Sequence, residues 1–321
     1  MPYLKAFSED EYRSAKRYLS TQVASMMGRK LEEGDWSSVY CLAKGIPDGK
    51  WSNLNIDINH KGLGLELKAL RISGAKSKSL KSVCGTTLMH PAATRSIRID
   101  DTSLPADEVM IDVFKQYADL IRDRTQKVRA LSPDIEPDMR TGWLIWEDTL
   151  EEFLYFEEKM HIPNPEDYIA AWNITPAKGS RKASKSLWIY DKNTRQKRYS
   201  VTTSAGVKIQ PYFDVPLPDD ENLYYFRAQS EPVDAYTVRL WITSATANAL
   251  RAGLGSLDKG VVSDAILKAI EEHSHNLKGP ELDDGLAVPV DITKESYRKL
   301  STVWDTVSDE HKAQLLLKAL S

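Results

Sequence analysis

The chain has little cysteine and no long hydrophobic run. Its 321 residues include two cysteines, Cys41 and Cys84, which form no Cys-x-x-Cys pair, so neither a disulfide framework nor a structural zinc site is expected. No apolar stretch approaches the roughly 18 residues of a membrane span, and residues 1–18 lack the apolar segment of a secretory signal. No Walker A sequence occurs, which argues against a nucleotide cofactor. We therefore expect a cytoplasmic protein without a membrane segment.

The charge of the chain is nearly balanced overall but unevenly distributed. The formal net charge is −3, whereas residues 61–98 and residues 178–198 each carry eight bases against one acid. The compensating acids lie mainly in residues 131–167 and 256–321. Such a separation can steer an anionic ligand to one face of a protein, although two solvated basic loops would give the same pattern. The two basic stretches are therefore candidates for contacts with nucleic acid.

Hydrophobic periodicity predicts an α/β protein whose character changes near residue 250. Apolar residues at steps of three and four predict helices over residues 9–33 and 106–129. Residues 251–321 have a helical pattern and are expected to form a C-terminal subdomain. Strands are predicted in TGWLIWED, EFLYFEEK (which could instead be helical), GVKIQPYFDV, NLYYFRAQ and YTVRLWIT, and a hairpin in SLWIYDKNTRQKRYSVT that turns near residues 192–194.

The segment NIDINHKGLGLELKAL alternates apolar and polar residues and predicts two strands with one buried face. If Lys61 and Gly62 form a two-residue turn, pairing runs symmetrically outward from it. Asp57 then faces Glu66, with Cβ atoms about 5 Å apart. Lys68 lies two positions farther along the same face. The sequence therefore predicts that two carboxylates and one ammonium group converge.

Two carboxylates this close repel each other unless a cation joins them. Mg²⁺ takes one or two protein carboxylates, and water or phosphate oxygens complete its shell, so we expect it at Asp57 and Glu66. Lys68 could orient or deprotonate the attacking water and neutralise charge on a phosphate. With the flanking basic stretches, this set indicates hydrolysis of a phosphodiester in nucleic acid. The alternative is a set of ordinary surface ion pairs, each worth under about 1 kcal/mol.

An Asp on one strand followed by Glu-x-Lys on the next is similar to the active site of the PD-(D/E)xK nuclease superfamily. GLGLELK looks especially like the equivalent strand of the methyl-directed mismatch-repair nicking endonuclease and its restriction-enzyme relatives, and GRKLEE fits the family's helical Gly-x-x-Leu-Glu pattern. The resemblance covers roughly residues 20–125, and Ile56 stands where the family usually has proline. It implies a restriction-endonuclease-like mixed β-sheet core flanked by helices, Mg²⁺ held by Asp57 and Glu66, a catalytic Lys68, and an accessory carboxylate at Glu32, with Glu33 as its close competitor.

The acid-x-Lys triplet occurs four times in the chain, so context must decide among them. The triplet that begins at Asp48 lies in a predicted turn, although proline precedes the aspartate. The triplet at Glu310 lies in a predicted helix, and that at Glu157 has no clean partner strand with a facing aspartate. Only the triplet at Glu66 has every feature, so we predict the active site there.

The long sequence beyond the catalytic core favours a type II restriction endonuclease over a repair nickase, because it provides surface to read a DNA site. Residues 1–250 would form the nuclease domain with its recognition hairpins. We expect a homodimer, since a twofold protein matches a palindromic duplex, although a monomer that nicks is also possible. The alternatives are a repair or modification-dependent nuclease and, in another class, a DNA-binding protein without cleavage activity.

Basic, hydroxyl and imidazole side chains in the two basic stretches are the expected contacts to double-stranded DNA. Tyr224, Tyr225, Phe226 and the tryptophans are expected in the core rather than as base-stacking platforms. The expected DNA contacts are Lys76, Lys78, Lys81, Thr87, His90, Arg95, Arg98, Lys182, Lys192, Arg195 and Arg198.

Overall fold

The computed structural model of the chain is a mixed α/β protein, in agreement with the expected class. Within the part of the chain that it describes, no helix is long and apolar enough to cross a membrane. The described residues are 3–26, 31, 33–47, 56–72, 79–91, 97–147, 150–177, 183–203, 208–228, 230–242, 244–271 and 288–296.

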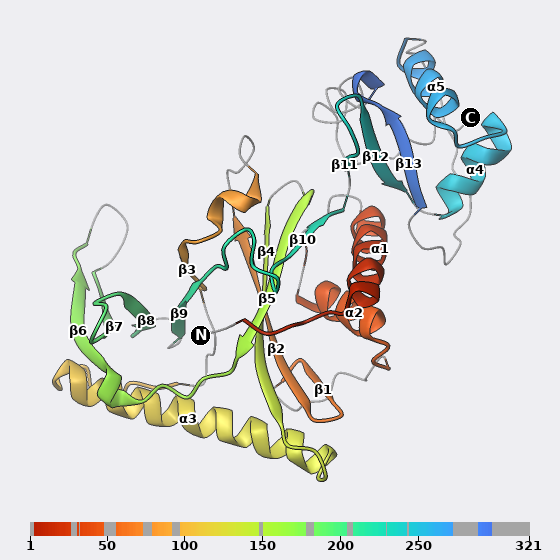
Figure 1. Cartoon of the computed structure of the whole chain (residues 1–321). Coiled ribbons are helices and arrows are strands. Elements are labelled where there is room, and N and C mark those ends of the chain that lie inside the picture. Colours follow the sequence, from red (N-terminus) through yellow and green to blue (C-terminus); the bar gives the residue numbers. More distant parts are fainter. Residues whose placement is uncertain are drawn as a thin grey trace.

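A mixed five-stranded sheet forms the centre of the larger part of the molecule (Figure 1). In order across the sheet, its strands are β1 (Ile58–His60), β2 (Leu63–Ile72), β4 (Asp138–Glu147), β5 (Glu152–Lys159) and β10 (Tyr224–Arg227). Strands β2 and β4 run parallel, and the other neighbours are antiparallel. The connection between β2 and β4 contains the 26-residue helix α3 (Ala106–Leu131), since parallel neighbours need a long crossover. The strands predicted in TGWLIWED and EFLYFEEK are confirmed.

The hairpin β1–β2 has the predicted turn and register. Ile58 lies opposite Leu65, and Lys61 and Gly62 have φ of 46° and 81°, the left-handed pair that a two-residue hairpin turn uses. The predicted first strand is too long, because β1 begins only at Ile58. Before it, the Asp57 side chain rather than the backbone bonds to β2.

Two helices cover one face of the main sheet (Figure 1). Leu19 and Trp36 from these helices pack with Leu65 and Leu67 of β2 in one buried cluster. The helix predicted over residues 9–33 is confirmed over residues 9–26, but it ends earlier than predicted, and residue 31 is not helical. The sequence has Gly28 soon after the first helix ends, and glycine destabilises a helix by about 1 kcal/mol relative to alanine. The two helices are α1 (Glu9–Met26) and α2 (Glu33–Lys44).

Helix α3 and a second sheet lie on the opposite side (Figure 1). In order, this antiparallel sheet contains β3 (Thr87–Met89), β9 (Ile209–Asp214), β8 (Lys197–Thr202), β7 (Ser184–Asp191) and β6 (Tyr168–Thr175). Its inner face packs on α3 through Leu187 and Ile189, among others. Trp143 of β4 stacks on Phe213 of β9 with 3.9 Å between ring centroids, which joins the two sheets. The predicted hairpin is confirmed as β7 and β8, with its turn at residues 192–194.

In the C-terminal part, the residues that the structure describes form a three-stranded sheet and two helices. The elements are β11 (Ser230–Pro232), β12 (Thr237–Ile242), α4 (Ser244–Leu254), α5 (Lys259–Glu271) and β13 (Val288–Thr293). The expectation that this part is wholly helical is wrong, because β13 pairs with β12 across the predicted boundary at residue 250. Val288, Val290 and Ile292 alternate with other residues, as strands do, and Pro289 is tolerated because β13 is an edge strand.

Candidate functional site

Strand β2 carries Glu66 and Lys68 on the face that looks toward α3. Residues two apart on a strand share a face, and the intervening Leu65 and Leu67 belong to the cluster beneath α1 and α2. Glu66 is 7% exposed and Lys68 is 9% exposed. Charged side chains are rarely this buried unless they are paired. The alternation therefore places both side chains on one face, as the sequence predicts. That face is also buried, so the prediction of only one buried face is wrong for this part of β2.

One oxygen atom, Oε1 of Glu66, contacts two cations. Lys68 Nζ lies 2.8 Å from it, and Nη2 of Arg124, on α3, lies 3.3 Å from it. All three side chains are about nine-tenths buried. Within the described residues, Nε of Arg124 has no hydrogen-bond partner. Glu66 therefore holds two buried cations by itself, and Arg124 retains an unused donor.

Beyond the end of the short strand β1, two carboxylates bind backbone amides of β2. Asp57 Oδ2 accepts a hydrogen bond from the Leu67 amide at 2.6 Å, and Glu33 Oε1 accepts one from the Ala69 amide at 3.4 Å. Amides two residues apart point to the same edge of a strand. Asp57 and Glu33 therefore follow each other along the edge that β1 leaves open.

The pKa of Asp57 is raised from its ordinary value of 3.8 to about 6. Burial is the main cause, and the negative charge of Glu66 adds to it. The Leu67 amide and the Lys68 ammonium group lower the pKa, and the charge of Glu33 raises it further. At neutral pH the carboxyl group is ionised, but its surroundings destabilise the ionised form. A nearby cation would reduce this destabilisation.

Asp57 and Glu66 could hold a divalent cation. In the described part of the chain, the contacts of these carboxylates engage Oδ2 and Oε1, which leaves Oδ1 and Oε2 as oxygen ligands. No cluster of three or more His, Cys, Asp or Glu side chains suited to a metal occurs among the described residues. A structural zinc site needs four protein ligands, whereas Mg²⁺ is held by one or two carboxylates and water. The donor set therefore fits Mg²⁺.

Five predicted site residues lie outside the described ranges. The helical carboxylate is one of them, since Glu32 is not described and its competitor Glu33 lies at the edge of β2. The residues outside the described ranges are Glu32, Lys76, Lys78, Arg95 and Lys182.

The described DNA-contact candidates between residues 81 and 98 differ in accessibility. Lys81 and Arg98 are exposed. The Thr87 hydroxyl is also exposed and donates a hydrogen bond to a carboxylate of β9 at 2.5 Å. His90 is only 5% exposed, and its ring centroid lies 5.8 Å from that of Trp143. Burial favours a packing role for His90 over a contact with a DNA groove.

The remaining candidates lie on the β7–β8 hairpin. Lys192 Nζ donates to a backbone carbonyl at 2.6 Å, and Arg198 forms an ion pair with Asp214 at 2.8 Å. Arg195 is exposed beside the turn. Arg195 is thus the most accessible cation of the three, and Arg198 would have to leave a partner to bind a phosphate.

Arg124 belongs to the candidate site but is not among the site residues predicted from the sequence. A signal for it exists in the sequence. Tyr117, Ile121 and Val128 mark the buried stripe of α3, and Arg124 lies three residues after Ile121 and four before Val128. A charged residue within a buried stripe needs a partner in the core, and here that partner is Glu66.

The competing triplet at Glu157 serves another purpose. Glu157 is fully buried, pairs with Arg140 at 2.9 Å and accepts a hydrogen bond from the Tyr155 hydroxyl at 2.8 Å. Lys159 is exposed. The carboxylate therefore neutralises a partly buried arginine rather than joining a lysine. The triplets at Asp48 and Glu310 lie outside the described residues.

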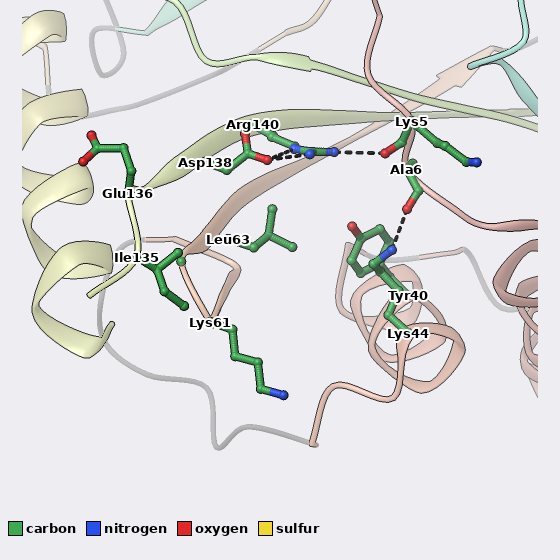
Figure 2. Close-up of a pocket in the computed structure, with 11 residues that line it drawn as sticks. Lys5, Ala6, Tyr40, Lys44, Lys61, Leu63, Ile135, Glu136, Asp138 and Arg140 are labelled. Carbon is green, nitrogen blue, oxygen red and sulfur yellow. Dashed lines mark hydrogen bonds and ion pairs between the residues drawn. The ribbon is translucent and has the colours of Figure 1, made fainter. Parts of the chain in front are cut away.

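A pocket of about 220 Å³ lies away from these residues, beside the β1–β2 turn and α2 (Figure 2). Lys44 donates to the Ala6 carbonyl, and Arg140 binds Asp138 and the Lys5 carbonyl, as the dashed lines show. The pocket does not include the candidate catalytic residues. Its cations are largely used in holding the N-terminal segment to the sheet.

Function is inferred from the chemistry of the site itself, because comparisons with protein-family models, curated proteins and solved structures gave no match to this chain.

Proposed function

We propose that the chain is a Mg²⁺-dependent endonuclease of double-stranded DNA, of the type II restriction class, which acts in the cytoplasm as a homodimer. The observation that carries the proposal is the cluster formed by buried Glu66 and Lys68 on β2 and partly buried Asp57, which directly precedes β1 and binds the Leu67 amide. The resemblance of GLGLELK and GRKLEE to PD-(D/E)xK nucleases supports the same chemistry. A protein that only binds DNA does not require this set of residues.

Asp57 and Glu66 would hold the metal through the oxygens that the protein leaves unused. When bound, Mg²⁺ would polarise the scissile phosphate and lower the pKa of a bound water. Asp57 must be ionised to serve as a ligand, so its pKa of about 6 makes the site competent at neutral pH and less so in acid.

Lys68 and Arg124 supply the positive charge for the substrate. Their two charges balance Asp57 and Glu66, so the site would carry excess positive charge with a dication bound, which suits a phosphodiester. Lys68 Nζ has three donor protons, of which contact with Glu66 uses one. The others can orient a water or bind a phosphate oxygen. The unused Nε of Arg124 can bind a phosphate in the same way.

The charge distribution supports DNA as the substrate. The chain places Lys81 and Arg98 on exposed surface after β2, and Arg195 on the hairpin of the second sheet. When such cations bind DNA phosphates, they release counterions from the backbone, and this release increases the affinity of the protein for DNA. A symmetric pair of chains would present two active sites to the two strands of a palindrome.

Cleavage of phage DNA with Mg²⁺ or with EDTA, followed by sequencing of the ends, tests the proposal. We expect defined ends that form only with Mg²⁺ and that are lost in Lys68→Ala. Lys159→Ala is the matched control, because Lys159 is the exposed lysine of the other described triplet. DNA binding without cleavage, on substrates of every methylation state, would contradict the proposal, and cleavage of methylated DNA alone would assign the enzyme to the modification-dependent class.

A further inference from the structure

The outer face of the second sheet carries an aromatic group that the core does not use. Side chains alternate along a strand, and Leu187, Ile189 and Ile209 point inward to α3. Trp188 and Tyr212 therefore point outward, as does Tyr190 beyond an irregularity in the pairing with β8. These three aromatic residues belong to none of the hydrophobic clusters found among the described residues, and each is partly exposed. The expectation that every tryptophan lies in the core is therefore incorrect for Trp188.

A lysine lies among these rings. Lys197 Nζ is 3.3 Å from the centroid of the Trp188 ring and 5.2 Å from that of Tyr212. Tyr190 lies directly opposite Lys197 in the pairing of β7 with β8. Two aromatic rings thus contact one cation, and a third aromatic residue lies opposite it on the same face of the sheet.

We propose that this outer face binds single-stranded nucleic acid, with bases stacked on Trp188, Tyr190 and Tyr212 and with Lys197 bound to the backbone phosphate. Aromatic side chains on an open sheet are suited to this task because every unpaired base has a π face. Stacking of a base on a ring is stronger than an exposed cation–π contact. Lys197 can therefore give up Trp188 to a base and move to a phosphate.

The charges at the end of the face favour nucleic acid. Lys192 and Arg195 are exposed at the turn that joins β7 to β8. Asp214 binds Arg198, and Asp191 accepts hydrogen bonds from amides of the turn. Exposed Glu166 and Asp167 lie beside Lys192, which binds their backbone carbonyls. Arg195 is therefore the cation of the turn best placed for a phosphate.

The polar residues of the face suit exposed bases rather than an intact duplex. Ser186 and Gln210 alternate onto the same side as Trp188, are partly exposed and offer hydrogen-bonding groups to base edges. In a duplex the π faces are hidden in the stack, and only groove edges and phosphates are accessible. The proposal does not depend on the cleavage reaction, because it uses no residue of the β2 site.

Fluorescence anisotropy of labelled oligonucleotides, with the full chain in EDTA so that cleavage plays no part, tests the proposal. The probes are a 20-nucleotide single strand of mixed sequence and the matching 20-base-pair duplex. We expect Trp188→Leu and Tyr212→Leu each to weaken binding of the single strand about tenfold, in line with the loss of one stacked base, and to change duplex binding less than twofold. Lys197→Gln should flatten the salt dependence of single-strand binding, with a slope lower by about 0.7.

Tyr236→Leu is the control, because Tyr236 is a tyrosine in the turn between β11 and β12 and is 79% exposed. This variant should leave both affinities unchanged. Thermal unfolding verifies that each variant is folded. The proposal is overturned if the wild-type chain does not bind the single strand, or if both aromatic variants bind it as the wild type does. It is also overturned if they lose affinity for duplex and single strand equally, which would indicate duplex docking.

Discussion

Replacing Asp57 with asparagine should make the protein more stable at pH 8. The ionised carboxylate is partly buried beside Glu66, and its pKa lies at about 6 instead of 3.8. At about 1.36 kcal/mol for each pH unit, this difference corresponds to about 3 kcal/mol of lost stability when the group is ionised. Asparagine has nearly the same shape, and its amide oxygen can still accept the hydrogen bond from the Leu67 amide.

The gain from Asp57→Asn should depend on pH in a defined direction. The folded-state pKa is raised, so protonation favours the folded wild type, and its penalty develops as pH rises from about 4 to above 6. The variant should therefore exceed the wild type by about 3 kcal/mol at pH 8 and by about half of that at pH 5. Below about pH 4 the two proteins should differ little.

Urea unfolding, followed by tryptophan fluorescence at pH 8 and pH 5, measures this difference. Asp119→Asn is the control, because Asp119 is an exposed carboxylate in a surface ion pair, and its loss should change stability by less than about 1 kcal/mol. A variant that is less stable than the wild type at pH 8, or a difference that is the same at both pH values, would refute the proposed electrostatic strain at Asp57.

Three further predictions concern catalysis, the ion-pair cluster and DNA binding. Lys68→Ala should slow single-turnover cleavage by orders of magnitude while largely keeping DNA affinity, whereas Lys50→Ala should have at most a modest effect. The opposite ranking would mean that the active site is assigned to the wrong segment. Glu66→Gln should destabilise the fold by about 3 kcal/mol in urea unfolding, because two buried cations lose their shared counter-ion; an unchanged midpoint would mean that the cluster is solvated. Changing Arg195 and Arg198 to glutamate should weaken DNA binding and flatten its salt dependence, as measured by anisotropy. An unchanged salt dependence would mean that the tip of the hairpin is solvated and does not contact DNA.

The local features of the site could be predicted from the sequence. The pairing of Ile58 with Leu65 follows from a two-residue turn at Lys61 and Gly62 and from alternation on either side of it. Once that register is known, Glu66 and Lys68 must share a face, and Asp57 must lie near them. These relations depend on residues within about fifteen positions of each other, so no long-range contact is needed to derive them.

Features that depend on distant contacts could not be predicted in the same way. Arg124 is 58 residues from Glu66 in sequence, and its helical position does not reveal which strand it meets. The pairing of β13 with β12 also joins distant segments. Pro289 lies within the alternating pattern of β13, and a proline there argues against a strand. The outward position of Trp188 depends on which face of its sheet packs on α3, and a tryptophan is equally compatible with either face.

Cleavage of DNA by the wild-type chain and by Asp57→Asn, compared side by side with Mg²⁺ under single-turnover conditions, is the most direct test of the proposed nuclease. The variant is expected to be at least as stable as the wild type at pH 8, so loss of activity could not be ascribed to unfolding. We predict that the wild type produces defined ends, and that the variant binds the same DNA but yields no product. Cleavage by Asp57→Asn at the wild-type rate would contradict the assignment of the metal site.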